Sequence, residues 1–311
     1  MKKIPLYTVG FKSPKAFGSI YWFSRLIVLI LLAYNTVCCR KLVEDDFPDF
    51  PSIPVINSIL IADSLLKVHV SFTDKIGNSK LAGIENALVI VASGSRENDT
   101  LTSIGNSIYQ AKTVVQPLET YTLQVTIPGY ETIVCSNTIP DTPEILAIQS
   151  INYAGIDEEG NTYPALKVTF KNKPDEALYF QIAIKLIQYD TVTFAQLIHI
   201  TDPVLLHEGV PIPVFSNELI KTDSYTMLLN YTSGSQNNLD PLLVELRAIS
   251  YDYYLYLKQL YLYETGRYPT EVGTGAVTNF NLYSNIEDGY GIFAGYSLVV
   301  SDTVQPETYY Y

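Results

Sequence analysis

The sequence predicts a mainly β protein, because three features recur from residue 55 onward. Short runs of strand-forming residues follow one another closely, either alternating or continuously apolar. Turn-forming residues separate these runs, and a single segment has the spacing and end signals of a helix. The chain also contains 25 Tyr and 12 Phe against 2 Met, and aromatic residues favour strands.

The first half of this body predicts a small antiparallel β-sandwich over residues 55–140. The predicted strands are 55–62, 66–72, 87–92, 108–111, 121–127 and 131–139. Strict alternation places Leu66, Val68, Val70 and Phe72 on one face, which we expect to be buried. Strands at this spacing are typical of a sandwich. The order of Ile84–Val91 before Thr120–Tyr130 resembles that of Ig-like, transthyretin-like and carboxypeptidase-regulatory modules, which implies a structural or binding unit.

Two prolines in Thr138–Pro143 predict a domain boundary, followed by a second β-rich domain over residues 144–311. Its predicted strands are 145–153, 165–170, 179–189, 225–231 and 242–249. A helix is expected over 251–264, with Ser250 as its cap and Gly266 and Pro269 as stop signals. The helix itself carries aromatic and apolar residues on all of its faces. We therefore expect it to be wedged between layers or covered by a partner.

The first 38 residues predict a lipoprotein signal peptide. They contain Lys2, Lys3, Lys12, Lys15 and Arg25 and no acidic residue, and Leu26–Ala33 is an apolar run too short to span a bilayer. Thr36–Cys39 resembles a bacterial lipobox, with Cys39 as the lipidated first mature residue and small Cys38 before the cut. An ordinary secreted protein or an uncleaved anchor is the alternative. Residues 39–54, rich in proline and acids, are expected to form a tether.

The charge and the cysteine content narrow the classes of function that the protein can have. Residues 1–38 hold five of the 20 basic residues and none of the 32 acidic ones, so the mature chain would carry a net charge of −17. Such a chain repels phosphates, which argues against nucleic-acid binding and against electrostatic binding to anionic lipids. After lipidation Cys135 is the remaining cysteine, and its apolar surroundings predict a buried, inert thiol.

No motif for catalysis, a cofactor or a metal is present. His69, His199 and His207 are far apart and do not match zinc spacing. Gly289–Gly295 misses the spacing of a dinucleotide fingerprint and predicts a tight aromatic turn instead. The acidic pairs in Asp157–Glu159 and Glu287–Asp288 are adjacent along the chain, as in solvated turns, although a carboxylate pair for hydrolysis stays a weaker alternative.

Two segments carry a family resemblance. Ser250–Lys258 followed by Leu282–Tyr296, with Pro54–Asn57, Asp63–Val68 and Ile84–Ala87 in the first half, resembles the Bacteroidota lipoprotein family called domain of unknown function 4249. The resemblance implies an outer-membrane lipoprotein, often encoded beside TonB-dependent transporters. Its most specific part predicts an interaction turn or a purely structural closure, built from Asn285, Glu287, Asp288, Gly289, Tyr290, Gly291, Phe293 and Tyr296.

Two functions therefore compete, neither of them enzymatic. The first is an accessory or lid protein of a TonB-dependent transporter, held at the outer membrane by palmitate and other acyl chains on Cys39. The second is a free-standing surface module that binds glycans or peptides on exposed tyrosines, with Tyr251, Tyr254, Tyr283 and Tyr290 as candidates. No cofactor is expected for either function.

Overall fold

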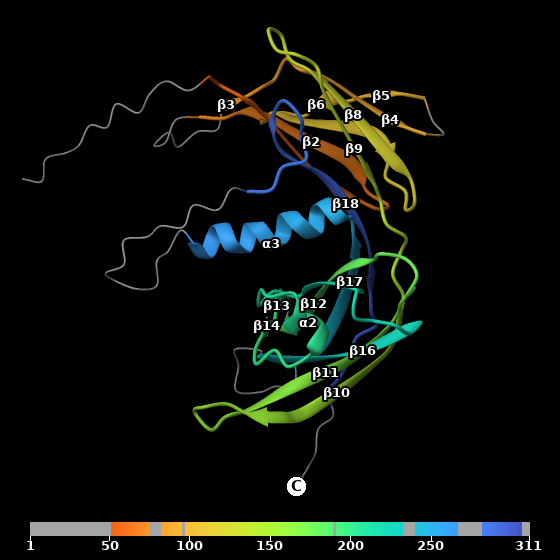
Figure 1. The fold of residues 1–311 in the computed structure, drawn as a ribbon, viewed down its shortest axis with the longest axis vertical. Helices are drawn as coiled ribbons and strands as arrows, with labels where there is room; N and C mark the ends of the chain where they lie inside the picture. The colour runs from red at the N-terminus through yellow and green to blue at the C-terminus, as the bar shows by residue number, and fades with distance from the viewer. Residues whose placement is uncertain are drawn as a thin grey trace, which may run out of the picture. The chain divides into compact units, whose positions relative to one another are not determined.

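The computed structural model describes residues 51–74, 82–94, 97–188, 191–232, 240–266 and 282–306. Residues 50–311 form one compact unit. The predicted signal peptide, Cys39, the tether up to residue 50 and Pro269 lie outside the described residues. The body is mainly β, as predicted, and its described residues form three sheets and two helices (Figure 1).

The three sheets are built from strands that are distant in sequence. The largest runs in the order β13 (Thr191–Phe194), β12 (Tyr179–Gln188), β17 (Leu242–Ile249), β18 (Tyr290–Val300), β1 (Pro54–Ile61), β2 (Leu65–Phe72), β7 (Ile108–Val114) and β6 (Thr102–Ser103), with β15 (Val214–Ser216) beside β12 and β3 (Ala82–Gly83) beside β2. The second runs β10 (Ile145–Ile156), β11 (Thr162–Lys171), β16 (Ser224–Thr232) and β14 (Gln196–Leu197). The third runs β5 (Asp99–Thr100), β4 (Leu88–Ser93), β8 (Thr120–Thr126) and β9 (Ile133–Thr138).

The first hydrophobic core lies between the third sheet and the β1–β2–β7 part of the largest sheet. The predicted alternation in β2 is confirmed: Leu66, Val68 and Val70 are buried, and Phe72 packs against the same core. Each such side chain contributes about 1.5–3 kcal/mol on burial. Cys135 on β9 is buried in this core, and burial raises the pKa of its thiol to about 12, as expected of an inert cysteine.

A parallel pairing closes this sandwich, which corrects the expectation of a purely antiparallel one. Strand β18 runs parallel to β1, from Val55 opposite Tyr290 to Ile61 opposite Tyr296. The predicted aromatic turn over residues 285–296 is therefore wrong beyond Gly289, because a strand begins at Tyr290. Phe293 inserts into the first core, not into a core of the second half.

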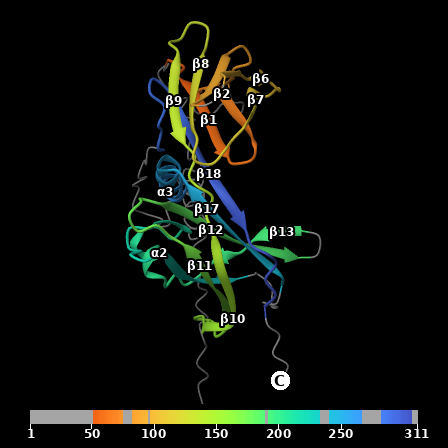
Figure 2. The same ribbon diagram turned by 90° about the vertical axis from the view of Figure 1, so that its right-hand side faces the viewer.

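The second core lies between the β10–β11–β16 sheet and the β12–β17 part of the largest sheet. Phe170, Phe180 and Phe215 form its aromatic centre, with ring centroids 5.4–5.6 Å apart. The two cores share one sheet, because β18 pairs with β1 on one side and with β17 on the other (Figure 2). The predicted boundary at residues 140–144 thus separates two cores that a single sheet connects.

Helix α3 (Tyr251–Gly266) confirms the predicted helix, but it is not wedged between layers. None of its side chains is buried, and apolar residues occur all around its axis. One side packs on the largest sheet, where Tyr253, Tyr254 and Leu257 join Ile249 and Tyr296 in a third cluster. In the residues that the structure describes, no helix has the length and apolar character needed to cross a bilayer.

The sequence analysis missed helix α2 (Pro203–His207) and the short strands β13, β14 and β15. Helix α2 has an evident start signal in hindsight. Asp202 caps it by accepting a hydrogen bond from the Val204 amide at 3.0 Å, and Pro203 occupies its first turn. Proline in the first turn and aspartate before it are common at helix starts.

Candidate interaction site

The predicted interaction turn is mostly a structural junction. The side chain of Asn285 accepts a hydrogen bond from the Phe293 amide at 2.9 Å and donates one to the Phe293 carbonyl at 2.8 Å. This pair ties the segment before β18 to the strand itself. Phe293 is fully buried and Tyr296 nearly so. These three residues therefore hold the turn in place.

Two glycines allow β18 to lie close to β1. A Cβ on Gly291, where φ is +117°, would lie 1.9 Å from the Ile56 carbonyl oxygen. A Cβ on Gly295 would lie 2.7 Å from the Leu60 carbonyl oxygen and 2.4 Å from a methyl carbon of Ile139. Both positions exclude any other residue unless a neighbour moves. Their glycines are explained by backbone packing.

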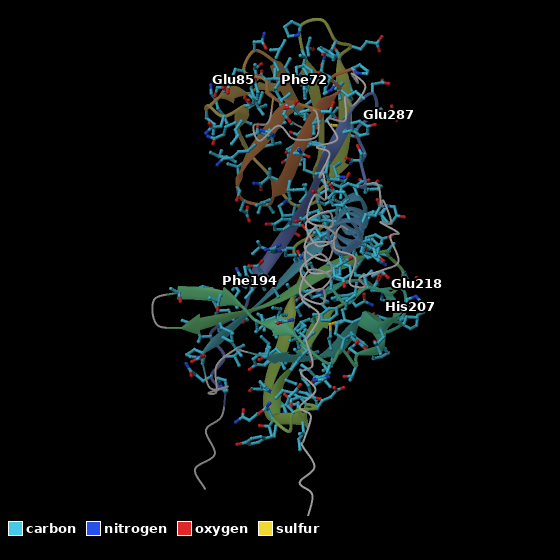
Figure 3. All side chains as sticks on the ribbon, turned by 90° about the vertical axis from the view of Figure 1, so that its left-hand side faces the viewer. Phe72, Glu85, Phe194, His207, Glu218 and Glu287 are labelled. Carbon is cyan, nitrogen blue, oxygen red and sulfur yellow. The ribbon has the colours of Figure 1, made fainter. Side chains whose placement is uncertain are left out.

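The exposed part of the predicted turn is its tip. Glu287 and Asp288 are exposed, Tyr290 is 52% exposed and Gly289 is half-buried beside the Pro54 carbonyl. Figure 3 shows Glu287 in a different region from the Glu218–His207 pair, which lies near α2. The tip thus offers two carboxylates and one tyrosine ring to solvent.

A cluster of three tyrosines lies elsewhere on the surface and was only partly predicted. The ring of Tyr179, at the start of β12, lies 5.1 Å from that of Tyr251 and 4.8 Å from that of Tyr254. We call Tyr179, Tyr251 and Tyr254 the tyrosine cluster. They line a groove of about 510 Å³ together with polar residues that include Asp175, Asn217, Glu218 and Lys221. Aromatic faces beside polar groups are typical of ligand sites.

A second groove, of about 520 Å³, shares Tyr179 and Tyr251 with the first. It extends toward β9 and is lined there by Asn137 and Thr138, with Asp141, Lys173 and Glu176 along its rim. Lys173 lies 3.3 Å from Glu176 and 3.7 Å from Asp141, so this rim is an ion-pair network. Tyr179 and Tyr251 of the tyrosine cluster therefore form a wall common to both grooves.

The start of α3 is anchored beside these grooves by Asp252. Its carboxylate accepts hydrogen bonds from the Asn137 side-chain amide at 2.6 Å and from the Tyr283 hydroxyl. Burial, together with the hydrogen bond to this carboxylate, raises the pKa of Tyr283. A negative side chain in the first turn also stabilises the helix dipole. The Tyr283 hydroxyl is thus engaged within the protein.

Glu208 binds the middle of α3 through Tyr254 and Lys258. Its buried carboxylate accepts hydrogen bonds from the Tyr254 hydroxyl, from Lys258 Nζ at 2.9 Å, and from the Ser216 amide at 2.7 Å. Burial alone would raise the pKa of Glu208, but these hydrogen bonds outweigh it and lower the pKa below its usual range. For Lys258, burial would lower the pKa, and the bonds to Glu208 and Tyr254 raise it.

The four predicted tyrosines therefore separate into three groups. Tyr251 and Tyr254 line a groove, the Tyr283 hydroxyl donates to Asp252, and Tyr290 is the first residue of β18. Tyr179 was missed because its alternating context indicated only a strand. The acidic turn at Asp157 is solvated as predicted, with Asp157 accepting the Asn161 amide at 2.6 Å. Within the described residues, no three metal-binding side chains come together.

These features define a class: a mainly β protein with two cores on a shared sheet, a surface helix and tyrosine-lined grooves. The family model described as Domain of unknown function (DUF4249) matches residues 40–301. The chain therefore belongs to the DUF4249 family, which confirms the family named from the sequence. No curated protein matches the chain.

Proposed function

We propose that this protein is a non-enzymatic, lipid-anchored outer-membrane lipoprotein that serves as an accessory or lid partner of a TonB-dependent transporter in nutrient uptake. The observation that carries the proposal is helix α3. It has tyrosines and leucines all around its axis; Tyr251 is exposed, and the others are half-buried and none is fully buried. A soluble protein gains by hiding such a surface, so a helix of this kind indicates a protein contact.

The side of α3 that faces away from the sheet provides the contact surface. At 100° per residue, Leu255 and Leu262 lie opposite the side formed by Tyr253 and Leu257. Asp252 and Glu208 fix the helix at its start and middle, so the surface is presented rigidly. Rigid presentation reduces the entropy lost on binding.

Membrane attachment rests on Cys39 and the basic, apolar segment before it. Several acyl chains on one residue hold a protein on a bilayer far longer than one chain does. Cys39→Ser should therefore move the protein from the membrane pellet to the soluble fraction, and Cys38→Ser should not. Equal membrane retention of both variants would refute the lipid anchor.

The transporter partnership is tested by purifying the lipidated protein from detergent-solubilised outer membranes and identifying its companions by mass spectrometry. We expect a TonB-dependent transporter with the wild-type protein and a reduced yield with the double variant Leu255→Ser and Leu262→Ser. The matched control is Ile104→Ser, since Ile104 is also apolar and is 52% exposed. Recovery of no transporter would contradict the proposal.

A second candidate function is a free-standing module for glycans or peptides, which the tyrosine cluster favours. Rings in the cluster can stack on sugar faces or side chains, and the exposed Glu218 and Lys221 in the same groove could fix the orientation of a ligand. A glycan and peptide array should then show retention that Tyr251→Ala abolishes. Tyr290→Ala, at a similarly exposed tyrosine outside the groove, is the control.

A further inference from the structure

Strand β10 forms a long open edge. In the part of the chain that the structure describes, β11 is its one neighbour in the sheet, as Figures 1 and 2 also show. Its 12 residues, ILAIQSINYAGI, include no charged residue and no proline. Proteins usually protect such edges with charges, prolines or very short strands. The edge strands β5, β6 and β14 have 2 residues each, β13 has 4 and β9 has 6, so β10, with 12, is the longest of these edges.

The hydrogen-bonding groups on the open side can be assigned from the register. The Lys171 amide donates to the Glu144 carbonyl at 3.0 Å, whereas the Asn172 amide donates to the Asp223 carbonyl, toward β16, at 2.7 Å. Odd-numbered residues of β11 therefore bond to β10. The register pairs Ala147 with Thr169, Gln149 with Lys167 and Ile151 with Ala165.

The other two residues of the regularly paired stretch Ala147–Ile151 are Ile148 and Ser150, and their backbone groups point toward the open side of β10. Because backbone groups alternate between the two sides of a strand, the N–H and C=O of Ile148 and Ser150 face away from β11. Register shifts flank the stretch, between Ile145 and Ala147 and between Ile151 and Gly155. The usable edge is therefore the five residues from Ala147 to Ile151.

Acidic residues stand at both ends of this edge. Asp141 and Glu144 precede it and are ion-paired with Lys173 at 3.7 Å and with Lys171 at 3.0 Å, and Asp157, Glu158 and Glu159 follow it. The five acidic residues outnumber these two lysines, so the flanks keep a negative balance. All five acidic residues except Asp157 are exposed, and Asp157 is half-buried. A second copy paired antiparallel through Ile148 and Ser150 would place Asp141 of one copy opposite Asp157 of the other. Like charges in facing positions are unfavourable, so the charge pattern disfavours self-pairing.

We propose that β10 binds an extended segment of a partner protein, which adds as a strand along Ala147–Ile151 and carries Lys or Arg at both ends. The outward groups of Ile148 and Ser150 supply the backbone hydrogen bonds, and the acidic flanks supply the charge complementarity. Strand addition to an open edge is a common mode of peptide recognition. The proposal goes beyond the proposed function and stands without it, because α3 is not involved.

The test is a titration of the full chain, in detergent, into the fluorescein-labelled peptide KKTVTVTKK, followed by fluorescence anisotropy. We expect saturable binding that weakens at least tenfold with Ser150→Pro, because proline removes an outward N–H and spares the bonds to β11. The matched control is Val192→Pro. The Ala195 amide bonds to the Ile184 carbonyl, so Val192 faces outward on the β13 edge, and this variant should bind as the wild type does.

A second peptide, EETVTVTEE, tests the charge pattern and should bind at least tenfold more weakly than the basic one at low salt. No saturable binding of the basic peptide, or equal binding by Ser150→Pro, would overturn the proposal. A doubled molecular mass in light scattering that Ser150→Pro abolishes would also overturn it, because the occupant would then be a second copy.

Amide hydrogen exchange of the unmodified protein provides a readout that does not depend on any variant. Without peptide, the amides of Ile148 and Ser150 should exchange faster than those of Ala147, Gln149 and Ile151, which are bonded to β11. Adding the basic peptide should slow exchange at Ile148 and Ser150 selectively. Uniform protection along β10, or protection only in the grooves, would contradict strand addition.

Discussion

Single residues decide whether the two cores can share a sheet. At Gly291 a side chain would collide with the backbone of β1, and the positive φ excludes most residues as well. At Glu208 one buried carboxylate joins β15 to α3 by accepting hydrogen bonds from Ser216, Tyr254 and Lys258. From the sequence alone, the glycines in this segment indicated a turn. The sequence does not show that the distant strand β1 lies against them. Their role is evident only once β1 is in place.

Gly291→Ala should lower the free energy of unfolding by roughly 2–4 kcal/mol, because both the contact with Ile56 and the backbone conformation oppose a Cβ. Urea unfolding measures this loss. Gly160→Ala is the control: its φ is also positive, at +86°, but no atom lies within 4 Å of the added carbon, so about 1 kcal/mol is expected. Equal losses would show that contact with β1 is unimportant.

Glu208→Gln should change the pH dependence of stability. The folded state lowers the pKa of Glu208 from 4.5, so its contribution is present above that pH and is lost as the pH falls through the lower, folded value. At pH 7 the variant should be less stable by about 1–3 kcal/mol, since Lys258 loses its partner. Thermal unfolding between pH 3 and pH 7 should show this difference shrinking below about pH 4.5. A constant difference would contradict the assignment.

Among the elements, those with strong local patterns were predicted well. Strands β2, β8, β11, β12 and β17 and helix α3 agree with the expected ranges to within a few residues. Alternation or helical spacing identifies them without reference to any neighbour. Strand β18 and the short strands β13–β15 form only because their pairing partners lie beside them. Tyr179 lines a groove only because α3 packs against β12. Such information is absent from local patterns.

The two sides of α3 should differ in their effect on stability. Tyr253 stacks on Tyr296 with ring centroids 5.8 Å apart, so Tyr253→Ala should cost about 2–4 kcal/mol. Leu255→Ala, on the side away from the sheet, should cost less than about 1 kcal/mol. Urea unfolding of both variants checks the orientation of the helix. A larger loss at Leu255 would mean that the outward side is already covered within the chain.

At the scale of the whole molecule, one sheet connects both cores, and residues 50–311 should therefore unfold together. Val68 in the first core and Val244 in the second are both fully buried. Val68→Ala and Val244→Ala should each cost about 1–3 kcal/mol and shift the same single transition, followed by circular dichroism and by tyrosine fluorescence. Two separable transitions, each moved by one variant, would show that the cores are independent domains.

The proposed function combines a predicted lipid anchor, a rigid body and a half-buried apolar helix that would contact a transporter. The most direct test is photo-crosslinking in native outer membranes, with a benzophenone amino acid at Leu255 on α3 and, as a control, at Ile104 on the loop before β7. The account predicts a crosslink from residue 255 to a TonB-dependent transporter and none from residue 104. Absence of a transporter crosslink at residue 255, or equal crosslinking from both positions, would contradict it.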